Sequence, residues 1–463
     1  MDATALVSAW NALVHHLACV FTRPTAAVWE QLALGWVLHR GPATVTGMIR
    51  TLGPLAERHW TVYHKFFYRA SWSLSDLSAQ LLTKVIYPLI LRAAQRNGRT
   101  GKPVVDLHID DTTAGRYGRH VAHAGWFKDA SCSGPAYKGT VIHWAHNWVV
   151  GAVTLRLPRW PLVRWVLPVL FALYRKQDDC NGDHPFQTRQ QMAAAMVRQA
   201  AEALPGVIWR VCVDGQYATR DMVAGLPAGA NLVSRIRCDA ALHDLPTGRR
   251  RKGCRRGPVP KKGKRLVKLK ELAQRTDGWK TITVSHQGRQ VTREVLGIVC
   301  LWYHVCRATP VRVVIVRDPD GRQKDDYFFC TDATVGEQEI VQRATDRWGI
   351  EESIQEAKQQ LGFENTRGWC SKTVNRQAPL AMVLVTLVKA WYASAALEEP
   401  RLLPKGTPWL PDKQRPTFLD MLSALRGVLW RHRIFEHNSG NSTLARQVHK
   451  LLAAVDYVLC AAA

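Results

Sequence analysis

The chain has 463 residues, of which 63 are Lys or Arg and 37 are Asp or Glu, so its formal net charge is +26. Hydrophobic residues make up 47% and charged residues 22%, which excludes a wholly disordered chain. The length is too great for one ordinary domain. The excess of positive charge favours a polyanion as partner, because clustered Lys and Arg side chains repel one another until phosphates neutralise them.

The sequence has no typical targeting or membrane segment. The N-terminus carries Asp2 and no basic stretch ahead of its apolar residues, unlike a signal peptide. The most apolar stretches, 160–174 and 378–397, are interrupted by charged residues, so we expect buried core elements there. The 11 cysteines include no Cys-x-x-Cys pair, which favours a reducing compartment and argues against structural zinc.

Residues 1–100 are predicted to form a helical region. Apolar residues at helical spacing predict a helix over 25–39, and 44–50 with 55–67 form a candidate helix–turn–helix around Gly53-Pro54. Ser73, with Asp76 three residues on, indicates the start of a helix that runs to about Gln95. Given the net charge we interpret this region as DNA-binding, although plain helix packing explains the same pattern.

Strand-like and helical segments alternate over residues 101–238, which predicts an α/β fold. The expected strands are 103–109, 147–157, 207–213 and 231–237. Between them, residues 188–204 form an amphipathic helix that begins with a Thr188–Gln191 capping box.

Residues 239–332 are expected to form a basic loop followed by a β-strand insertion. The antiparallel strands expected there are 279–284, 290–302, 310–317 and 326–331. A helix over 337–361, closed by Gly362, lies in the next segment, 333–398. The last segment, 399–463, is predicted to be a helical C-terminal region.

The loop over residues 249–270 is the most basic part of the chain. A solvated loop explains its composition, but we favour contact with nucleic acid phosphates. The DNA-binding candidates in it are Arg250, Arg251, Lys252, Arg255, Arg256, Lys261 and Lys262.

Three acids are placed where chemistry is expected. Asp110 and Asp214 each follow a hydrophobic strand, and ligands of open α/β sheets bind at the carboxyl ends of strands. Either acid alone is also typical of a turn or cap. On the helix over 337–361, Arg347, Glu351 and Lys358 lie within roughly 60° of one another. An isolated Arg–Glu pair there would be an ordinary surface pair worth about 0.3–0.5 kcal/mol.

Together, these side chains predict a phosphoryl-transfer site. Three converging carboxylates can hold two divalent cations about 3.5–4 Å apart, and hard oxygen ligands favour Mg²⁺ or Mn²⁺. Arg347 and Lys358 would bind the DNA phosphates beside the scissile bond.

The residues DDT (110–112), VDGQY (213–217) and RWGIEESIQEAKQQLG (347–362) resemble the DDE transposases of bacterial insertion sequences. The closest resemblance is to the group with a β-strand insertion and a Tyr-x2-Arg-x3-Glu-x6-Lys signature. Arg347, Glu351 and Lys358 match that signature, whereas Ala344 stands in place of the Tyr. Asp111 competes with Asp110 as the first acid, and the Asp-x-Thr pattern of the family favours Asp110.

The resemblance implies an RNase H-like catalytic core, interrupted by the antiparallel β insertion and flanked by helical N- and C-terminal regions. It further implies that Asp110, Asp214 and Glu351 are the catalytic metal ligands, with Mg²⁺ or Mn²⁺ as cofactor, and that a homodimer cuts transposon ends and joins them to target DNA. Such a protein would be cytoplasmic and nucleoid-associated, without a membrane. The alternatives are a non-catalytic or decayed nucleic-acid-binding protein, or an RNase H-like nuclease without strand transfer.

Two further clusters are weaker candidates. Residues 178–183 resemble a calcium loop but lack the Glu at its twelfth position, so we expect a polar loop. His143 and His146 have i,i+3 spacing but lie in or near a strand, and no third metal ligand is evident.

Overall fold

A computed structural model describes residues 3–93, 95–129, 139–246, 260–286, 288–406, 408 and 410–436. The chain divides into two compact units. Unit 1 comprises Met1–Ala93, Asp111–Phe186 and Glu352–Ala463, and unit 2 comprises Ala94–Asp110 and Gln187–Glu351. Both units contain helices and strands, so the fold is mixed α/β, as the alternation of segments predicts.

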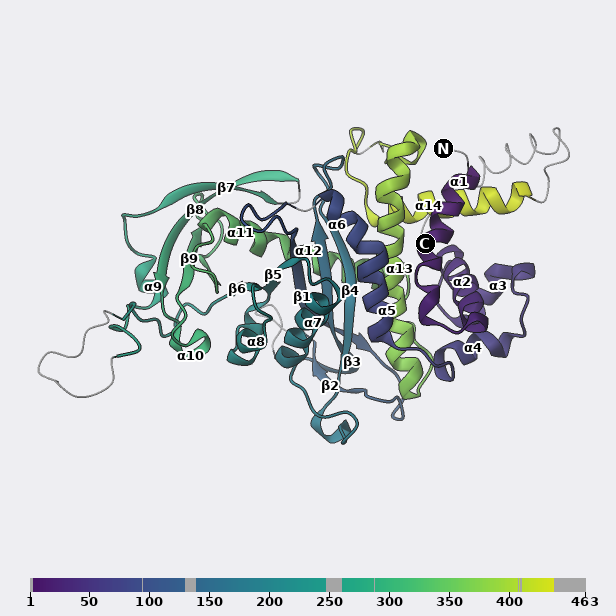
Figure 1. Ribbon diagram of the computed structural model, residues 1–463, viewed down its shortest axis with the longest axis horizontal. Helices are drawn as coiled ribbons and strands as arrows, with labels where there is room; N and C mark the ends of the chain where they lie inside the picture. Colours follow the sequence, from purple (N-terminus) through teal and green to yellow (C-terminus); the bar gives the residue numbers. More distant parts are fainter. Residues whose placement is uncertain are drawn as a thin grey trace, which may run out of the picture. The chain divides into compact units, whose positions relative to one another are not determined.

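The strands of unit 2 form one mixed sheet in the order β1-β5-β6-β10-β9-β8-β7 (Figure 1). Its strands are β1 (Val104–Gly115, which continues into unit 1), β5 (Ile208–Val213), β6 (Asn231–Arg235), β7 (Lys280–His286), β8 (Arg289–Cys300), β9 (Val311–Arg317) and β10 (Asp326–Cys330). Strands β1, β5 and β6 are parallel, whereas β10, β9, β8 and β7 are antiparallel. The four antiparallel strands predicted after the basic loop are therefore present as β7–β10, and β10 pairs with β6.

The helices of unit 2 are α7 (Arg189–Ala203), α8 (Arg220–Ala224), α9 (Leu269–Leu272), α10 (Tyr303–Cys306) and α11 (Glu337–Asp346). The predicted capping box at the start of α7 is confirmed, because the Thr188 hydroxyl accepts the Gln191 N–H and the Gln191 side chain accepts the Thr188 N–H.

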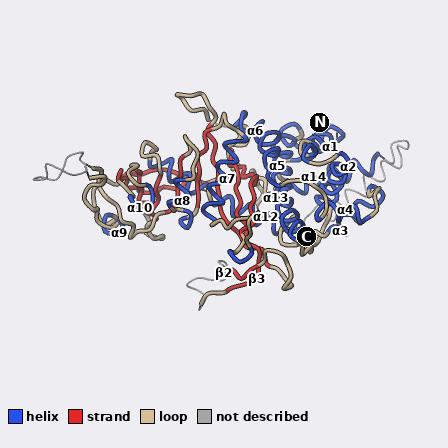
Figure 2. The backbone as a smooth tube through the Cα atoms, turned by 60° about the horizontal axis from the view of Figure 1, so that its bottom comes forward, coloured by secondary structure: helices blue, strands red, loops and turns tan. Residues whose placement is uncertain are grey.

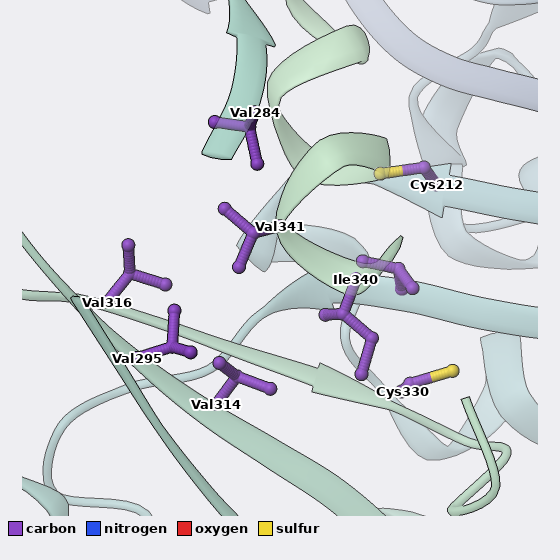
Figure 3. Packing of buried hydrophobic residues seen from close by; sticks show 9 residues of the cluster. Cys212, Val284, Val295, Val314, Val316, Cys330, Ile340 and Val341 are labelled. Atoms are coloured by element: carbon purple, nitrogen blue, oxygen red, sulfur yellow. The ribbon is translucent and has the colours of Figure 1, made fainter. Parts of the chain in front are cut away.

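Helix α11 packs on the sheet through a cluster of β-branched side chains (Figure 3). Ile340 and Val341 of the helix lie against valines of β6, β7, β8 and β9, and Cys212 of β5 and Cys330 of β10 complete the cluster. Each valine or isoleucine so buried stabilises the unit by about 1.5–3 kcal/mol. This packing fixes the end of α11, where the candidate site begins.

The helices of unit 1 come from both ends of the chain. They are α1 (Ala3–His15), α2 (Arg23–Leu38), α3 (Val45–Leu52), α4 (Trp60–Tyr68), α5 (Leu74–Gln80), α6 (Tyr87–Ala93), α13 (Ser371–Glu398) and α14 (Phe418–Glu436), with α12 (Trp348–Gln360) entering the unit at Glu352. A π-helical turn, Leu81–Ile86, joins α5 to α6. The predicted start at Ser73 is confirmed, because its hydroxyl accepts the Asp76 N–H.

Helix α13 is the central helix of unit 1 and packs against strand β4 (Trp165–Tyr174) (Figure 1). By length and composition, Leu74–Ala93 and Ser371–Glu398 could each cross a membrane, but 89% of the apolar window in Ser371–Glu398 is buried inside the protein. The apolar stretches 160–174 and 378–397 are thus buried core elements, as predicted.

Three arginines from the C-terminal part of unit 1 bind carbonyl groups at the C-terminal ends of α2, α3 and α4. Arg426 donates to the carbonyls of Val37 and His39 at the end of α2. Arg433 likewise contacts the last carbonyls of α3, and Arg376 those of α4. Helix ends leave such carbonyls without partners, and a cation there also opposes the helix dipole.

The strands within unit 1 are β2 (Gly125–Lys128), β3 (Ile142–Leu155) and β4, with β3 antiparallel to both neighbours. Figure 2 shows β2 and β3 side by side. β3 begins five residues before its predicted start, and β2 was not predicted. The polar stretch 178–183 lies in a loop that begins with a 3-10 turn, as expected.

Candidate catalytic site

Asp110 and Asp214 lie side by side on neighbouring strands of unit 2. Strands β1 and β5 are parallel, and Ile109 pairs with Val213. Each aspartate is the next residue, and adjacent strands lie about 4.8 Å apart. The prediction that Asp214 directly follows a buried strand is confirmed.

Asp214 has a fixed backbone. Its carbonyl accepts a 3.0 Å hydrogen bond from the Ser234 hydroxyl of β6 and another of 3.0 Å from the Tyr217 N–H. These bonds hold a short 3-10 turn directly after the aspartate, so its carboxylate is carried on a rigid part of the sheet.

Asp110 does not end its strand, and the predicted end at Ile109 is wrong. β1 continues through Asp110, Asp111 and Thr112 to Gly115. The polar residues are typical of a turn, but β-branched threonines are compatible with a strand, and Asp111 accepts a 3.0 Å hydrogen bond from the Asn147 side chain. Successive residues of a strand face opposite ways, so Asp110 and Asp111 do not share one site.

Arg347 connects two of the three predicted acids. Its guanidinium donates to Asp110 at 2.5 Å and pairs with Glu351 at 3.0 Å. The prediction that Arg347 and Glu351 share a helix face is confirmed. The expected single helix over 337–361 is interrupted, however, because α11 ends at Asp346 and α12 begins at Trp348. Gly349, a weak helix former, follows directly.

The electrostatics of Arg347 tie it to all three acids. Its side chain is 15% exposed and that of Asp110 is 13% exposed. Burial alone would lower the pKa of Arg347, but the surrounding acidic groups outweigh burial and raise it. These groups are Asp110, Cys212, Glu351 and Asp214. Arg347 is therefore the cation that balances the carboxylates of this site.

The carboxylates of the site are suitable ligands for a divalent cation, but in this structure they contact Arg347. Among the described residues, no three His, Cys, Asp or Glu side chains are grouped closely enough to hold a metal. Asp110 and Glu351 nonetheless provide the hard carboxylate oxygens that Mg²⁺ and Mn²⁺ prefer. A cation bound by both would require Arg347 to release them.

A groove of about 310 Å³ lies beside the site within unit 2. Arg235, Arg293 and Arg347 contribute cations to its lining, and Ala344 and Trp348 line it as well. Trp348 is 48% exposed where it lines this groove, whereas Ile350, two residues on, is buried. The groove residues Arg235 and Arg293 were not predicted, because their surroundings come from strands distant in sequence.

Three other predicted DNA-binding residues lie in the described part of the chain. Lys358, in unit 1, donates to the Thr113 carbonyl at 2.7 Å and pairs with Glu364 at 2.9 Å. Lys261 and Lys262 are exposed, and the Lys262 ammonium lies 5.4 Å from the Tyr303 ring centre. The remaining basic candidates fall outside the described residues; they are Arg250, Arg251, Lys252, Arg255 and Arg256.

The weak metal candidates have other partners. The His146 Nδ1 accepts from Arg116 at 2.7 Å, and its Nε2 donates to the Ala122 carbonyl at 2.9 Å. His143 lies 3.4 Å from Asp129. Both nitrogens of His146 are therefore occupied within the protein.

The fold is mixed α/β, Asp110 and Asp214 are neighbours on β1 and directly after β5, and one arginine joins Glu351 to Asp110. Together these features define a carboxylate-based site. The sequence matches the family described as DDE superfamily endonuclease over residues 16–291, more than half of the chain. The chain belongs to this family. The matched stretch contains Asp110 and Asp214 and ends before Glu351. A comparison with curated proteins finds no similar sequence. Membership indicates an enzyme of nuclease or transposase type, in a family that generally uses divalent metals.

Proposed function

We propose that the protein is a transposase that binds the terminal inverted repeats of an insertion sequence and catalyses metal-dependent DNA cleavage and strand transfer. The observation that carries the proposal is the Arg347 guanidinium, which contacts the carboxylates of Asp110 on β1 and Glu351 on α12. Asp214, at the end of β5, is the neighbour of Asp110 in the parallel pair and adds to the negative charge around Arg347. On this proposal β1, β5 and β6 belong to an RNase H-like core, and β7–β10 are the insertion.

The carboxylates of Asp110, Asp214 and Glu351 would hold two Mg²⁺ or Mn²⁺ ions. Bound ions would activate the attacking oxygen and stabilise the leaving oxygen of the phosphodiester. Arg347 keeps Asp110 and Glu351 in position beforehand, and once released it is placed to bind a phosphate. Arg235 and Arg293 line the adjacent groove, where they would bind the DNA backbone on either side of the scissile bond.

The partners follow from the same proposal. They are double-stranded DNA, as transposon end and target, and a second copy of the chain in a synaptic complex. The net charge of +26 supports a polyanionic partner. We propose a bacterial, nucleoid-associated location on the same grounds.

The test is incubation of the full chain with Mg²⁺ and DNA that carries the inverted repeats flanking its gene. We expect cleavage at the repeat ends and joining of the freed ends to a second DNA. Asp214→Asn and Glu351→Gln should each lower the cleavage rate more than about a hundredfold, because each removes a negative metal ligand. Gel analysis of end-labelled DNA measures both steps.

Glu352→Gln is the matched control. Glu352 is the next acid of α12, but it pairs with Arg164 at 3.2 Å, so its variant should cut like the parent. Equal cutting by the parent, Asp214→Asn and Glu351→Gln would overturn the site. Cleavage without joining would instead favour the nuclease.

A further inference from the structure

Three large aromatic side chains of unit 1, on β2 and on two connected loop segments, are exposed and are not used by the proposed chemistry. Tyr117 is 90% exposed, Trp126 is 56% exposed and Trp369 is 67% exposed. Isolated exposed apolar residues are ordinary, but a group of them indicates a binding surface. We call these three residues the aromatic surface.

Hydrogen bonds and one ring contact connect the segments that carry the three residues. The Ala122 N–H donates to the Trp369 carbonyl at 2.9 Å. The ring of Trp126 lies 5.6 Å from that of Trp144, edge to face. The Trp144 indole N–H in turn donates to the Gly118 carbonyl, directly after Tyr117. One surface therefore joins the loop after β1, the β2–β3 pair (Figure 2) and the segment before α13.

The loop that carries Tyr117 is held in a strained conformation. His123 has a φ of 61°, in the left-handed region that non-glycine residues rarely adopt. Its ring bonds Asp179 through Nδ1 and the Ser371 hydroxyl, at 2.7 Å, through Nε2. Such strain persists only where the surroundings fix it, and it is concentrated at functional sites.

The buried Arg116–His146 pair also fixes the loop that carries Tyr117. Arg116 donates to His146, which donates to the Ala122 carbonyl. Burial and the charge of Arg116 lower the pKa of His146 to about 3, so the ring stays neutral and the contacts persist at physiological pH. The loop thus presents its aromatic rings from a fixed backbone, which reduces the entropy lost on binding.

The charge around the aromatic surface is positive. Exposed cationic residues near these segments in sequence are Arg119, Lys128, Arg367 and Lys372. Acids contacting the same segments already have cationic or histidine partners: Asp129 lies near His143, Asp179 bonds His123, and Glu364 pairs with Lys358. The surface therefore favours an anion that also has flat, apolar faces.

We propose that the aromatic surface binds unpaired nucleotides of single-stranded nucleic acid, with bases stacked on Tyr117, Trp126 and Trp369 and phosphates on the surrounding cations. Every base has a face on which an aromatic ring can stack, so such binding tolerates any sequence. In a duplex those faces are covered by neighbouring base pairs, so intact double-stranded DNA does not fit. The site goes beyond the proposed transposase activity and does not depend on the carboxylates.

The test measures binding of a fluorescein-labelled oligothymidylate of about 20 nucleotides, and of a duplex of the same length, at about 0.1 M salt. We expect Tyr117→Ala/Trp126→Ala/Trp369→Ala to weaken oligothymidylate binding at least about tenfold while duplex binding changes less than about twofold. Fluorescence anisotropy gives both affinities.

Trp60→Ala is the matched control, because Trp60 is 57% exposed on α4 of the same unit, and it should retain oligothymidylate binding. Trp369→Ala alone, whose side chain is largely solvent-exposed, serves if the triple variant does not fold by circular dichroism. Unchanged oligothymidylate affinity, an equal loss for duplex, or no binding by the parent would each overturn the proposal. Asp214→Asn should still bind the oligonucleotide, so failure of cleavage and failure of this surface are separable.

Discussion

Lys389 in unit 1 and Arg347 in unit 2 both contact carboxylates, but the two surroundings differ. The Lys389 ammonium lies 2.5 Å from Glu356, 2.9 Å from the Ser353 hydroxyl and 3.1 Å from the Val166 carbonyl, and its side chain is 8% exposed. Burial raises the pKa of Glu356, and Lys389 opposes that rise. We call this pair enclosed because the Lys389 ammonium and the Glu356 Oε2 that it contacts are both buried, although the Glu356 side chain as a whole is 25% exposed.

The Arg347 site is open by comparison. Glu351 is 34% exposed, and Arg347 lines the groove beside Trp348. The residue types at the two sites are those of ordinary ion pairs. Access distinguishes them: an enclosed pair can only stabilise the fold, whereas an arginine that lines a groove can release its carboxylates to another cation. The predictions below test this distinction.

The largest expected effect is on the enclosed pair. Lys389→Met leaves the Glu356 carboxylate buried without its cation, so the free energy of unfolding should fall by about 3–5 kcal/mol. Urea unfolding measures this loss. Lys389→Met/Glu356→Leu should recover most of it, because no charge then remains buried. A loss that the double variant does not repair would show that packing, and not charge, holds this region.

The second effect depends on pH. Because the pKa of His146 is lowered to about 3 in the folded protein, the unfolded chain binds the extra proton between about pH 6.5 and 3. Stability is therefore fully present above pH 6.5 and is lost as pH falls. From pH 7 to 5, His146 should account for about 2 kcal/mol. Urea unfolding of the parent and of His146→Gln at pH 7 and pH 5 isolates the contribution of His146 to the free energy of unfolding. The same pH dependence in both proteins would contradict this prediction.

The third effect concerns the open site. Arg347→Met should lower the free energy of unfolding by about 1–2 kcal/mol, less than Lys389→Met does, because water reaches Glu351, which is 34% exposed, even though Asp110 is only 13% exposed. Millimolar Mn²⁺ should then raise the melting temperature of this variant more than that of the parent, since binding to the folded state stabilises it. Thermal melts with and without Mn²⁺ measure the difference. If Mn²⁺ raised the melting temperature of Lys389→Met by as much, the two sites would not differ in their access to a cation.

The smallest effect is expected at a solvated pair. Arg237 pairs with Asp239 at 2.8 Å, but both side chains are largely exposed. The hydrogen bond to Arg237 lowers the pKa of Asp239, yet water and salt screen such pairs. Asp239→Asn should leave the melting temperature unchanged within error. A clear drop would mean that exposure is a poor guide to the worth of ion pairs in this protein.

Much of the candidate site could be predicted from local sequence. Hydrophobic strands followed by acids identified Asp110 and Asp214, and helical spacing identified the Arg347–Glu351 pair. The end of β1 could not be predicted, because an Asp-Asp-Thr-Thr run is typical of a turn. Only its neighbour Asn147, 36 residues away, shows that Asp111 is accommodated in a strand.

Contacts between distant segments account for the rest. Arg347 binds Asp110 across 237 residues of sequence, and no periodicity within a helix can reveal that partner. Spacing also placed Trp348 on a helix face without showing what covers it, and that face lines a groove. Pairing of β10 with β6 likewise depends on register between distant strands. Sequence patterns within about 20 residues therefore predict helices and strands better than they predict which of these elements pack together.

The arginines that bind the carbonyl groups at the ends of α2, α3 and α4 limit how the chain can be divided. Arg376 and Arg426 are almost fully buried, and their acceptors lie between Val37 and Trp72. A shortened chain that began after Trp72 would lose the carbonyl acceptors that these two guanidinium groups bond. Residues 3–93 therefore do not form a separable DNA-binding module. Their helices pack with α13 and α14 in one helical body.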